Sequence, residues 1–177
     1  ANPGANTQVP IWLLGSSLFS AHLAAERGLP YAFASHFAPG LLLQAIELYR
    51  HLFQPSAKLA KPYVIIGVPV VAAPTDDEAE FLATSVFQRV LGILRGDRRP
   101  LPPPRAGFIE GLHPQERAGI ADFLGAAVIG GPDRVREGLE HLRQATQADE
   151  FMFVCDVYEP ALRLRSLDIA TAACRDA

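Results

Sequence analysis

The sequence is short of the features that mark several classes of protein. It has two cysteines in 177 residues, Cys155 and Cys174, and their spacing is not that of a metal site, so we expect both to be reduced. Its net charge of -3 leaves no excess of Lys and Arg to neutralise the phosphates of a nucleic acid. No apolar run reaches the roughly 20 residues of a membrane span, and the first ten residues lack the basic region and apolar core of a signal peptide. These absences favour a cytoplasmic protein that binds neither nucleic acid nor membrane.

Motifs that mark several well-known catalytic sites are also missing. The chain has no P-loop, no dinucleotide-binding fingerprint and no serine nucleophile elbow. None of its five histidines is paired at the helical spacing of metal ligands, so we expect no metal site. With 49% hydrophobic and 20% charged residues, the chain is expected to fold as a single domain over residues 1–177. The Pro- and Arg-rich residues 96–112 are expected to form an exposed connector inside that domain.

Strand-like and helix-like patterns alternate along the sequence. Apolar runs predict strands at residues 11–14, 31–35, 63–73 and 150–154, the first of them buried. Amphipathic patterns predict helices at residues 19–27, 39–53, 75–94, 113–125, 130–145 and 160–174. Thr75 and Glu78 form a capping-box signature at the start of the third of these helices. Residues 63–73 are apolar throughout, so we expect both faces of that strand to be covered, and Pro69 inside it is typical of an edge or a bulge.

This alternation favours an α/β fold with about four parallel strands joined by crossover helices. Four such strands form either a small open sheet or half of a (β/α)8 TIM barrel, and the pattern alone fits both. In a barrel, the chemistry is expected where the carboxyl ends of the strands meet.

The clearest candidate site is the junction "LLGSSLFS", where a strand gives way to a helix. The free N–H groups and the positive dipole end of a helix attract anions, so Gly15, Ser16, Ser17 and Ser20 are candidate ligands of a phosphate. Gly15 would allow close approach of the backbone, and the serines would add hydroxyl donors. The alternative is that a serine here simply caps the helix, which is a common role for this residue type.

Longer stretches carry a family resemblance. The segments "LLGSSLFSAHLAAERGLPYAFASHFAP", "YVIIGVPVVAAPTDDEAEFL", "AVIGGPDRVREGL" and "ADEFMFV" resemble the bacterial luciferase-like flavin-dependent monooxygenases, a (β/α)8-barrel family. The resemblance implies that Ser17 and Ser20, with the backbone of Gly15 and Ser16, hold the phosphate of flavin mononucleotide (FMN). It also implies that Ser35 and His36 lie near the isoalloxazine ring and the substrate.

His36 is the candidate catalytic residue. A neutral imidazole at the end of a strand could donate a hydrogen bond to a flavin oxygen or move a proton near neutral pH, although a packed histidine with a structural role is an equal alternative. The acidic residues at 76–80 are expected to stabilise a helix start. Asp156 and Glu159, which follow the last strand, are weaker candidates for acid–base chemistry.

The resemblance covers nearly the whole chain but only the C-terminal half of the family's barrel. Four strands alone would leave two sheet edges and an apolar barrel interior exposed, so we expect a homo-oligomer or completion by an N-terminal half-barrel. Whether the chain is an enzyme by itself is therefore open.

Four functions remain after these observations. The first is part of a monooxygenase that uses O2 and reduced FMN, supplied by a separate reductase, to oxidise a small organic substrate. The second is a flavin-binding or half-barrel interaction module without turnover, and a third, weaker one is an enzyme that uses a deazaflavin. The fourth is an unrelated α/β protein that binds another phosphorylated ligand at Ser17 and Ser20.

Overall fold

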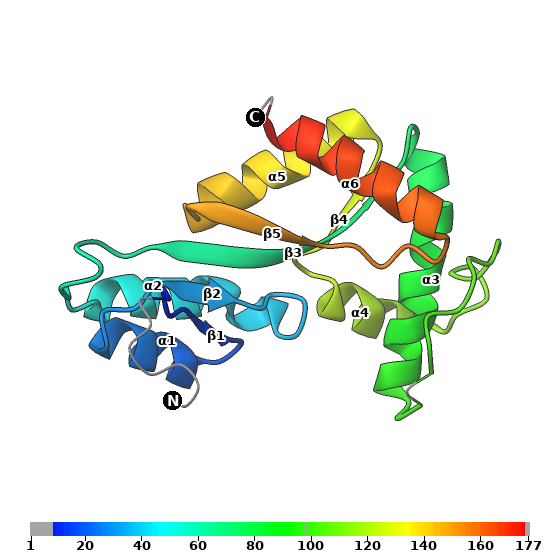
Figure 1. Cartoon of the computed structure of the whole chain (residues 1–177). Coiled ribbons are helices and arrows are strands. Elements are labelled where there is room, and N and C mark those ends of the chain that lie inside the picture. The colour runs from blue at the N-terminus through cyan, green and yellow to red at the C-terminus, as the bar shows by residue number, and fades with distance from the viewer. Residues whose placement is uncertain (1–8, 98, 176–177) are drawn as a thin grey trace.

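The computed structural model describes residues 9–97 and 99–175, and within them it shows one parallel β-sheet with helices joining its strands (Figure 1). Residues 1–8, which bear on the expectation of no signal peptide, lie outside the described part, as does Arg98 of the connector. The strands are β1 (Leu13–Gly15), β2 (Tyr31–Phe33), β3 (Val64–Ala72), β4 (Val128–Gly130) and β5 (Glu150–Val154). The helices are α1 (Leu18–Glu26), the 3-10 turn η1 (Pro39–Leu41), α2 (Leu42–Leu52), α3 (Asp76–Leu94), α4 (Pro114–Phe123), α5 (Pro132–Thr146) and α6 (Pro160–Arg175).

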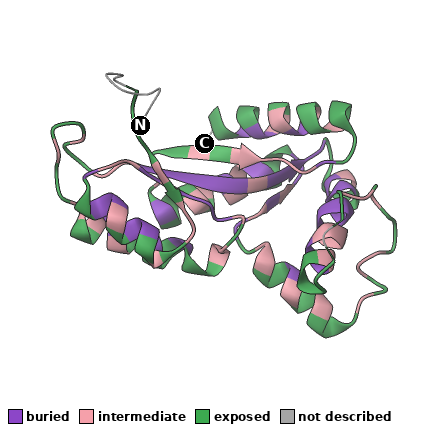
Figure 2. Cartoon of the chain, turned by 60° about the horizontal axis from the view of Figure 1, so that its bottom comes forward, coloured by how far each residue is buried: buried purple, intermediate pink, exposed green. Residues whose placement is uncertain are grey.

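β3 is the strand around which the sheet is organised. Its first residues, 64–66, pair with β2, which in turn pairs with β1, while residues 65–69 pair with β5 and residues 70–72 pair with β4. All of these pairings are parallel. Eight of the nine residues of β3 are buried, and Figure 2 shows the burial running along the strand, which confirms the prediction of a strand covered on both faces.

Pro69 lies in this central strand at a point where one side of the ladder is interrupted. Residues 67–69 pair with β5 but with neither β2 nor β4. A proline has no N–H to donate, so it fits where the strand has no neighbour to receive one. The sequence suggested an edge or a bulge, and the structure instead places Pro69 in a gap between two short neighbours.

The two faces of the sheet differ in their cover. One face carries Leu13, Tyr31, Phe33 and the even-numbered residues of β3, and packs into the main core with α1, α2, α5 and α6. On the other face, Leu14 is 71% exposed and Met152 is 59% exposed. The prediction that residues 11–14 form a buried strand is therefore wrong, because the strand spans only 13–15 and Leu14 points to the open face.

The structure corrects two further expectations for the elements. The sheet has five strands and not four, since the three residues of β4 form a strand that their short pattern did not reveal. The Thr75 hydroxyl accepts a hydrogen bond from the Glu78 N–H at 3.2 Å, as a cap should, but the Glu78 carboxylate pairs with Arg165 of α6 and does not complete the capping box. Among the described residues, no helix is long and apolar enough to cross a membrane.

Candidate functional site

The junction between β1 and α1 is a reciprocal helix cap. The Ser17 hydroxyl accepts a hydrogen bond from the Ser20 N–H, and the Ser20 hydroxyl accepts one from the Ser17 N–H, both at 3.3 Å. The Ser20 hydroxyl also donates to the Ser17 carbonyl at 2.7 Å and lies 2.9 Å from the Tyr31 hydroxyl. Both serines therefore shape the first turn of α1, as the alternative of simple capping requires.

Gly15 is needed because Ser20 occupies the space beside it. A Cβ atom added to Gly15 would lie 2.2 Å from the Ser20 Oγ and 2.3 Å from its Cβ. No residue with a side chain fits there while Ser20 keeps its position. The glycine in "LLGSS" thus serves the packing of the helix start.

The exposed part of this junction is suited to an anion. Ser17 is exposed while Ser20 is buried, so only the Ser17 hydroxyl faces solvent. The N–H groups of Leu18 and Phe19, in the first turn of α1, have no intrahelical carbonyl to bind. The first turn carries no acidic side chain that would repel a phosphate. These donors are suited to an anion such as the phosphate of a nucleotide cofactor. Ser20 would keep Ser17 in position through the hydrogen bonds between them.

Ser35 and His36 follow the end of β2 and lie against β3. Ser35 is fully buried, and its hydroxyl donates a hydrogen bond to the Gly67 carbonyl. The His36 ring lies beside the same glycine, since a Cβ atom at Gly67 would be 3.0 Å from the His36 Nδ1. The centre of the imidazole ring also lies 4.2 Å from the centre of the Phe37 ring. Ser35 therefore fixes the loop on β3, and His36 is the residue of the two that reaches an open space.

That space is a cavity of about 420 Å³ at the carboxyl ends of β3 and β5. Its walls are mainly apolar, and its polar members are His36, Arg89 of α3 and Asp156, which follows β5. Arg89 and Asp156 form an ion pair, with about a third of each side chain exposed. The lining residues are His36, Phe37, Pro69, Val86, Arg89, Val90, Ile93, Phe123, Leu124, Val154 and Asp156. We call this space the His36 cavity.

The environment of His36 favours its neutral form. Burial in the cavity wall lowers the pKa of the imidazole, the Asp156 carboxylate raises this pKa, and the Arg89 guanidinium lowers it. Burial is the largest of the three effects, because the charged ring would lose hydration that two opposite neighbouring charges do not replace. A neutral imidazole can both accept and donate a proton at near-neutral pH.

The sequence located part of this site and missed the rest. His36 was predicted from the family resemblance together with its position after a strand, and Asp156 was only a weaker candidate. Arg89 was not singled out, because it lies in the middle of a long amphipathic helix where an arginine gives no sign of function. Glu159, the other weak candidate, does not line the His36 cavity.

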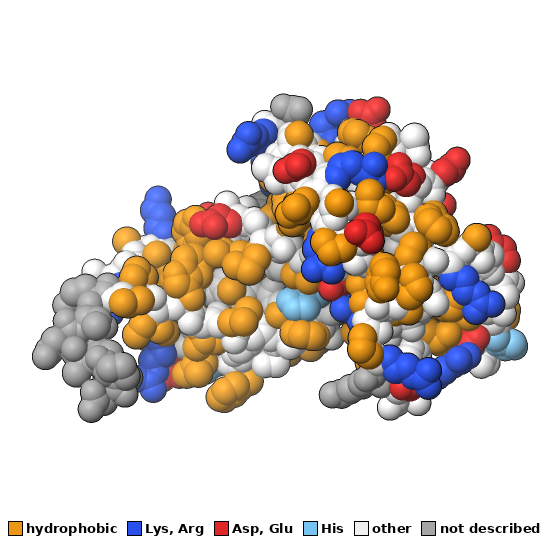
Figure 3. Space-filling view, turned by 45° about the vertical axis from the view of Figure 1, so that its right-hand side comes forward, with side chains coloured by type: hydrophobic (Ala, Val, Ile, Leu, Met, Phe, Trp, Pro, Cys, Tyr) orange, Lys and Arg blue, Asp and Glu red, His pale blue; other side chains and the backbone are white. Residues whose placement is uncertain are grey.

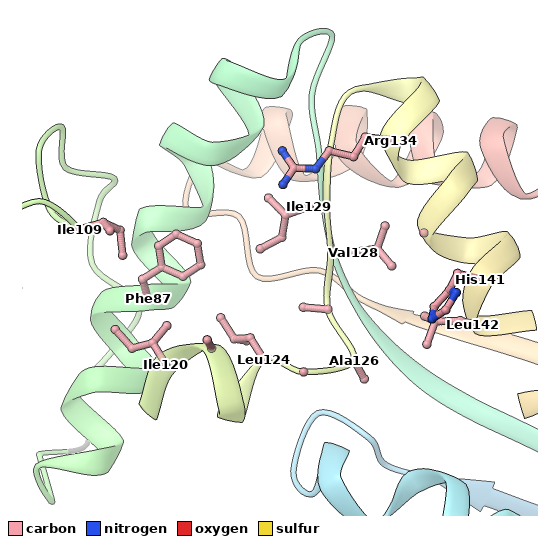
Figure 4. Close-up of a pocket in the computed structure, with 14 residues that line it drawn as sticks. Phe87, Ile109, Ile120, Leu124, Ala126, Val128, Ile129, Arg134, His141 and Leu142 are labelled. Carbon is pink, nitrogen blue, oxygen red and sulfur yellow. The ribbon is translucent and has the colours of Figure 1, made fainter. Parts of the chain in front are cut away.

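A larger groove of about 580 Å³ lies elsewhere, among α3, α4, β4 and α5 (Figure 4). Its lining is apolar apart from Arg134 and His141, both on α5. The Arg134 guanidinium is paired with Glu80 at 2.7 Å. The described residues of the groove lining contain no pair of titratable side chains suited to acid–base catalysis, since His141 and the paired Arg134 are its polar members. Within residues 9–97 and 99–175, no cluster of three or more His, Cys, Asp or Glu side chains could hold a metal ion.

Comparison with known proteins places this geometry in a family. The family model described as luciferase-like monooxygenase matches residues 1–149. The chain is 46% identical over 169 residues to the uncharacterized protein YvbT of Bacillus subtilis and 44% identical over 168 residues to a luciferase-like monooxygenase of Escherichia coli K12. These matches cover 96% and 95% of this chain and 50% of each relative. The chain thus spans about half the length of the curated relatives that it matches.

Solved structures give the same coverage. The crystal structure of apo-MsnO8 is 32% identical with a TM-score of 0.78, and the match covers 98% of this chain and 53% of that one. Two more distant structures show the fold alone. The oxygenating constituent of 3,6-diketocamphane monooxygenase from Pseudomonas putida, in complex with FMN, matches with 20% identity, a TM-score of 0.56 and coverage of 92% and 48%. An F420-dependent secondary alcohol dehydrogenase, in complex with an F420-acetone adduct, matches with 12% identity, a TM-score of 0.61 and coverage of 97% and 50%.

The parallel α/β sheet therefore aligns with half of the barrel of these proteins, and the chain belongs to the luciferase-like monooxygenase family.

Proposed function

We propose that this chain forms the phosphate-binding and His36-bearing part of a flavin-dependent monooxygenase that uses reduced FMN and O2 to oxidise a small organic substrate. The observation that carries the proposal is the shared edge of the sheet. The open N-terminus of α1 follows β1, and His36 follows β2, so both lie at the carboxyl ends of neighbouring parallel strands. In barrel enzymes the cofactor and the substrate meet at this edge.

In this proposal each polar group has a separate task. The Ser17 hydroxyl and the first-turn N–H groups of α1 bind the phosphate, while Gly15 and Ser16 bring the backbone close to it. Ser20 and Ser35 do not contact the ligand directly in this proposal. Their buried hydroxyls hold the start of α1 and the loop after β2 in place. His36 exchanges a proton or a hydrogen bond with the molecule in its cavity. The reduced flavin, when bound, supplies the electrons that activate oxygen.

FMN is the cofactor that we propose, because the structural relative bound to FMN is a monooxygenase component. A deazaflavin is the second candidate, because a protein of the same fold carries an F420 adduct. The donors at α1 recognise a phosphate and do not distinguish the two rings. Titration with each cofactor separates them.

We further propose that a second polypeptide segment completes the barrel, either an N-terminal half-barrel or another copy of this chain. The support is the open sheet face around Leu14 and Met152. A separate reductase would supply the reduced flavin. If the chain binds flavin but consumes no O2 with reduced FMN, the non-catalytic flavin-binding module is the better description.

The phosphate site is tested by titrating FMN into the purified chain and following the quenching of flavin fluorescence. Ser17→Ala, alone and with Ser20→Ala, should weaken binding by about 1 to 3 kcal/mol, or roughly 5- to 150-fold in Kd, as expected for lost hydrogen bonds to a charged group. Thr75→Ala is the matched control, because Thr75 caps α3 through the same kind of hydrogen bond.

The control separates loss of a ligand from loss of a cap. Removing either cap should lower the free energy of unfolding by about 0.5 to 2 kcal/mol, but only the Ser17 variant should lose affinity for FMN. Equal FMN affinity in the Ser17→Ala, Thr75→Ala and unchanged proteins would reduce Ser17 to a structural cap.

A further inference from the structure

The Arg89–Asp156 ion pair is built by parts of the chain that are far apart. Arg89 lies in α3 and Asp156 follows β5, 67 residues later, and both line the His36 cavity. With about a third of each side chain exposed, the pair is screened by solvent less than a typical surface ion pair, so its charges act more strongly on neighbouring groups. Its position beside an imidazole points to a role other than stability.

The surroundings of His36 leave one nitrogen of its ring available. The Nδ1 atom is buried and has no hydrogen-bond partner among the described residues. It lies next to Gly67, and the ring is also close to that of Phe37. Because Nδ1 is buried, Nε2 is the ring nitrogen left for a molecule in the cavity to contact. This arrangement suits a residue that gains or loses a proton at a single nitrogen atom.

Two charged groups line this cavity. Arg89 comes from α3, and Asp156 comes from the segment between β5 and α6. The residues contributed by β3 and α4, including Pro69 and Phe123, carry no charge. The Arg89 Nε is also buried without a partner among the described residues, so the guanidinium does not use all its donors within the ion pair.

We propose that Arg89 and Asp156 are positioning residues for His36: their ion pair shares the cavity wall with the imidazole and presents two opposite charges to it, and the balance of these charges sets how readily His36 exchanges a proton with the molecule in the cavity. The inference rests on the proposed function in one respect, namely that the molecule facing His36 is the flavin or the substrate. The effect of the two charges on His36 does not depend on a bound flavin, because both charges belong to this chain.

The balance predicts opposite effects for the two charges. Loss of the Asp156 carboxylate leaves the Arg89 cation alone beside the ring, and a like charge lowers the pKa of an imidazole. Loss of the Arg89 cation leaves the carboxylate alone, which raises that pKa. Loss of both charges should return the pKa of His36 toward its original value. A pair whose charges do not act on the imidazole would give no such shifts.

The test is an NMR titration of the full chain labelled with 13C-histidine, which follows the Cε1–Hε1 signals between pH 4 and 9. The His36 signal is assigned as the one lost in His36→Gln. The other four histidines, His22, His51, His113 and His141, are exposed and supply internal references. The pKa of His36 should fall in Asp156→Asn, rise in Arg89→Gln and lie between the two in the double variant. Asp156→Glu keeps the charge and should return the pKa toward that of the unchanged protein.

Glu140→Gln and Arg143→Gln are the matched controls, because they break an ion pair of similar chemistry on α5 that does not line the cavity. Neither should move the His36 titration. Shifts of the same sign in Asp156→Asn and Arg89→Gln, or no shift in either, would overturn the inference. A circular dichroism spectrum of each variant identifies any that fails to fold; if Asp156→Asn is one of these, a rise in the pKa of His36 in Arg89→Gln but not in Arg143→Gln carries the test.

The outcome is separable from that of the proposed function. Opposite shifts with no flavin binding would keep the role of the pair and reject the flavin site. Flavin binding without the shifts would keep the flavin site and reject the role of the pair. In a complex that turns over, Asp156→Asn should also move the acidic limb of the pH profile to lower pH while the Glu140→Gln profile stays in place.

Discussion

At the residue scale, Gly15 and Ser20 compete for one small volume at the start of α1. We predict that Gly15→Ala lowers the free energy of unfolding by about 1 to 3 kcal/mol, the usual cost of overpacking, because the new methyl group would overlap the Ser20 side chain. Urea denaturation measures the change. Gly40→Ala is the control, since a Cβ there would meet no atom within 4 Å and should change stability by less than about 0.5 kcal/mol. Equal effects of the two substitutions would mean that Ser20 can move aside freely.

Local and distant residues of the site differ in how well the sequence predicts them. Ser17 and Ser20 could be named because a cap and its helix are neighbours in the chain. The separate positions of the two serines, one exposed and one buried, could not be predicted from the sequence. The burial of Ser20 depends on Tyr31 of the next strand. Arg89 and Asp156 meet only through the fold, and neither position has a local pattern that indicates the other. Contacts of this kind need the structure.

At the scale of the element, long patterns were predicted well and short ones were not. β3 was placed within one residue at each end because its long run of β-branched residues is typical of a buried strand, and the bounds of β5 were predicted as the structure has them. The three residues of β4 give too short a pattern, and their pairing with the end of β3 decides their conformation. The end of β2 was placed two residues too late, because Ser35 is as buried as a strand residue but is held by its side chain.

The join between α6 and β3 gives a test at this scale. The Ser166 hydroxyl, fully buried on α6, accepts a hydrogen bond of 2.7 Å from the Ala72 N–H at the end of β3. Ser166→Ala should leave that N–H unpaired and lower the free energy of unfolding by about 1 to 3 kcal/mol. Hydrogen exchange at Ala72 should become faster. Thr171→Ala, exposed on the same helix, should change stability by less than about 0.5 kcal/mol, and the prediction is wrong if the two variants match.

At the scale of the whole molecule, the open sheet face dominates the behaviour expected in solution. Figure 3 shows hydrophobic side chains gathered over one side of the surface with few charges among them. Leu14 and Met152 are more than half exposed on the face of the sheet opposite the main core, outside the part that α3 and α4 cover. Apolar surfaces of this kind mark sites of association. The sequence predicted this exposure because four strands cannot close a barrel.

Charges on this face should therefore prevent association of the chain with itself. We predict that Leu14→Lys with Met152→Lys lowers the mass measured by light scattering at a given concentration and leaves the melting temperature nearly unchanged, since both side chains are exposed. Leu164→Lys adds a charge at an equally exposed position on α6 and is the control. An unchanged mass in the double variant would mean that association, if any, uses another surface.

The position of β3 in the chain also has a consequence for synthesis of the protein. Its partner β2 lies about 30 residues before it, whereas β5 lies about 80 residues after it. At about 5 to 20 residues per second, a ribosome needs on the order of 4 to 16 s to make the segment between them. During that interval the most apolar strand of the molecule has one long edge without a partner. We therefore expect this edge to be open to association with other chains until residue 154 has been made.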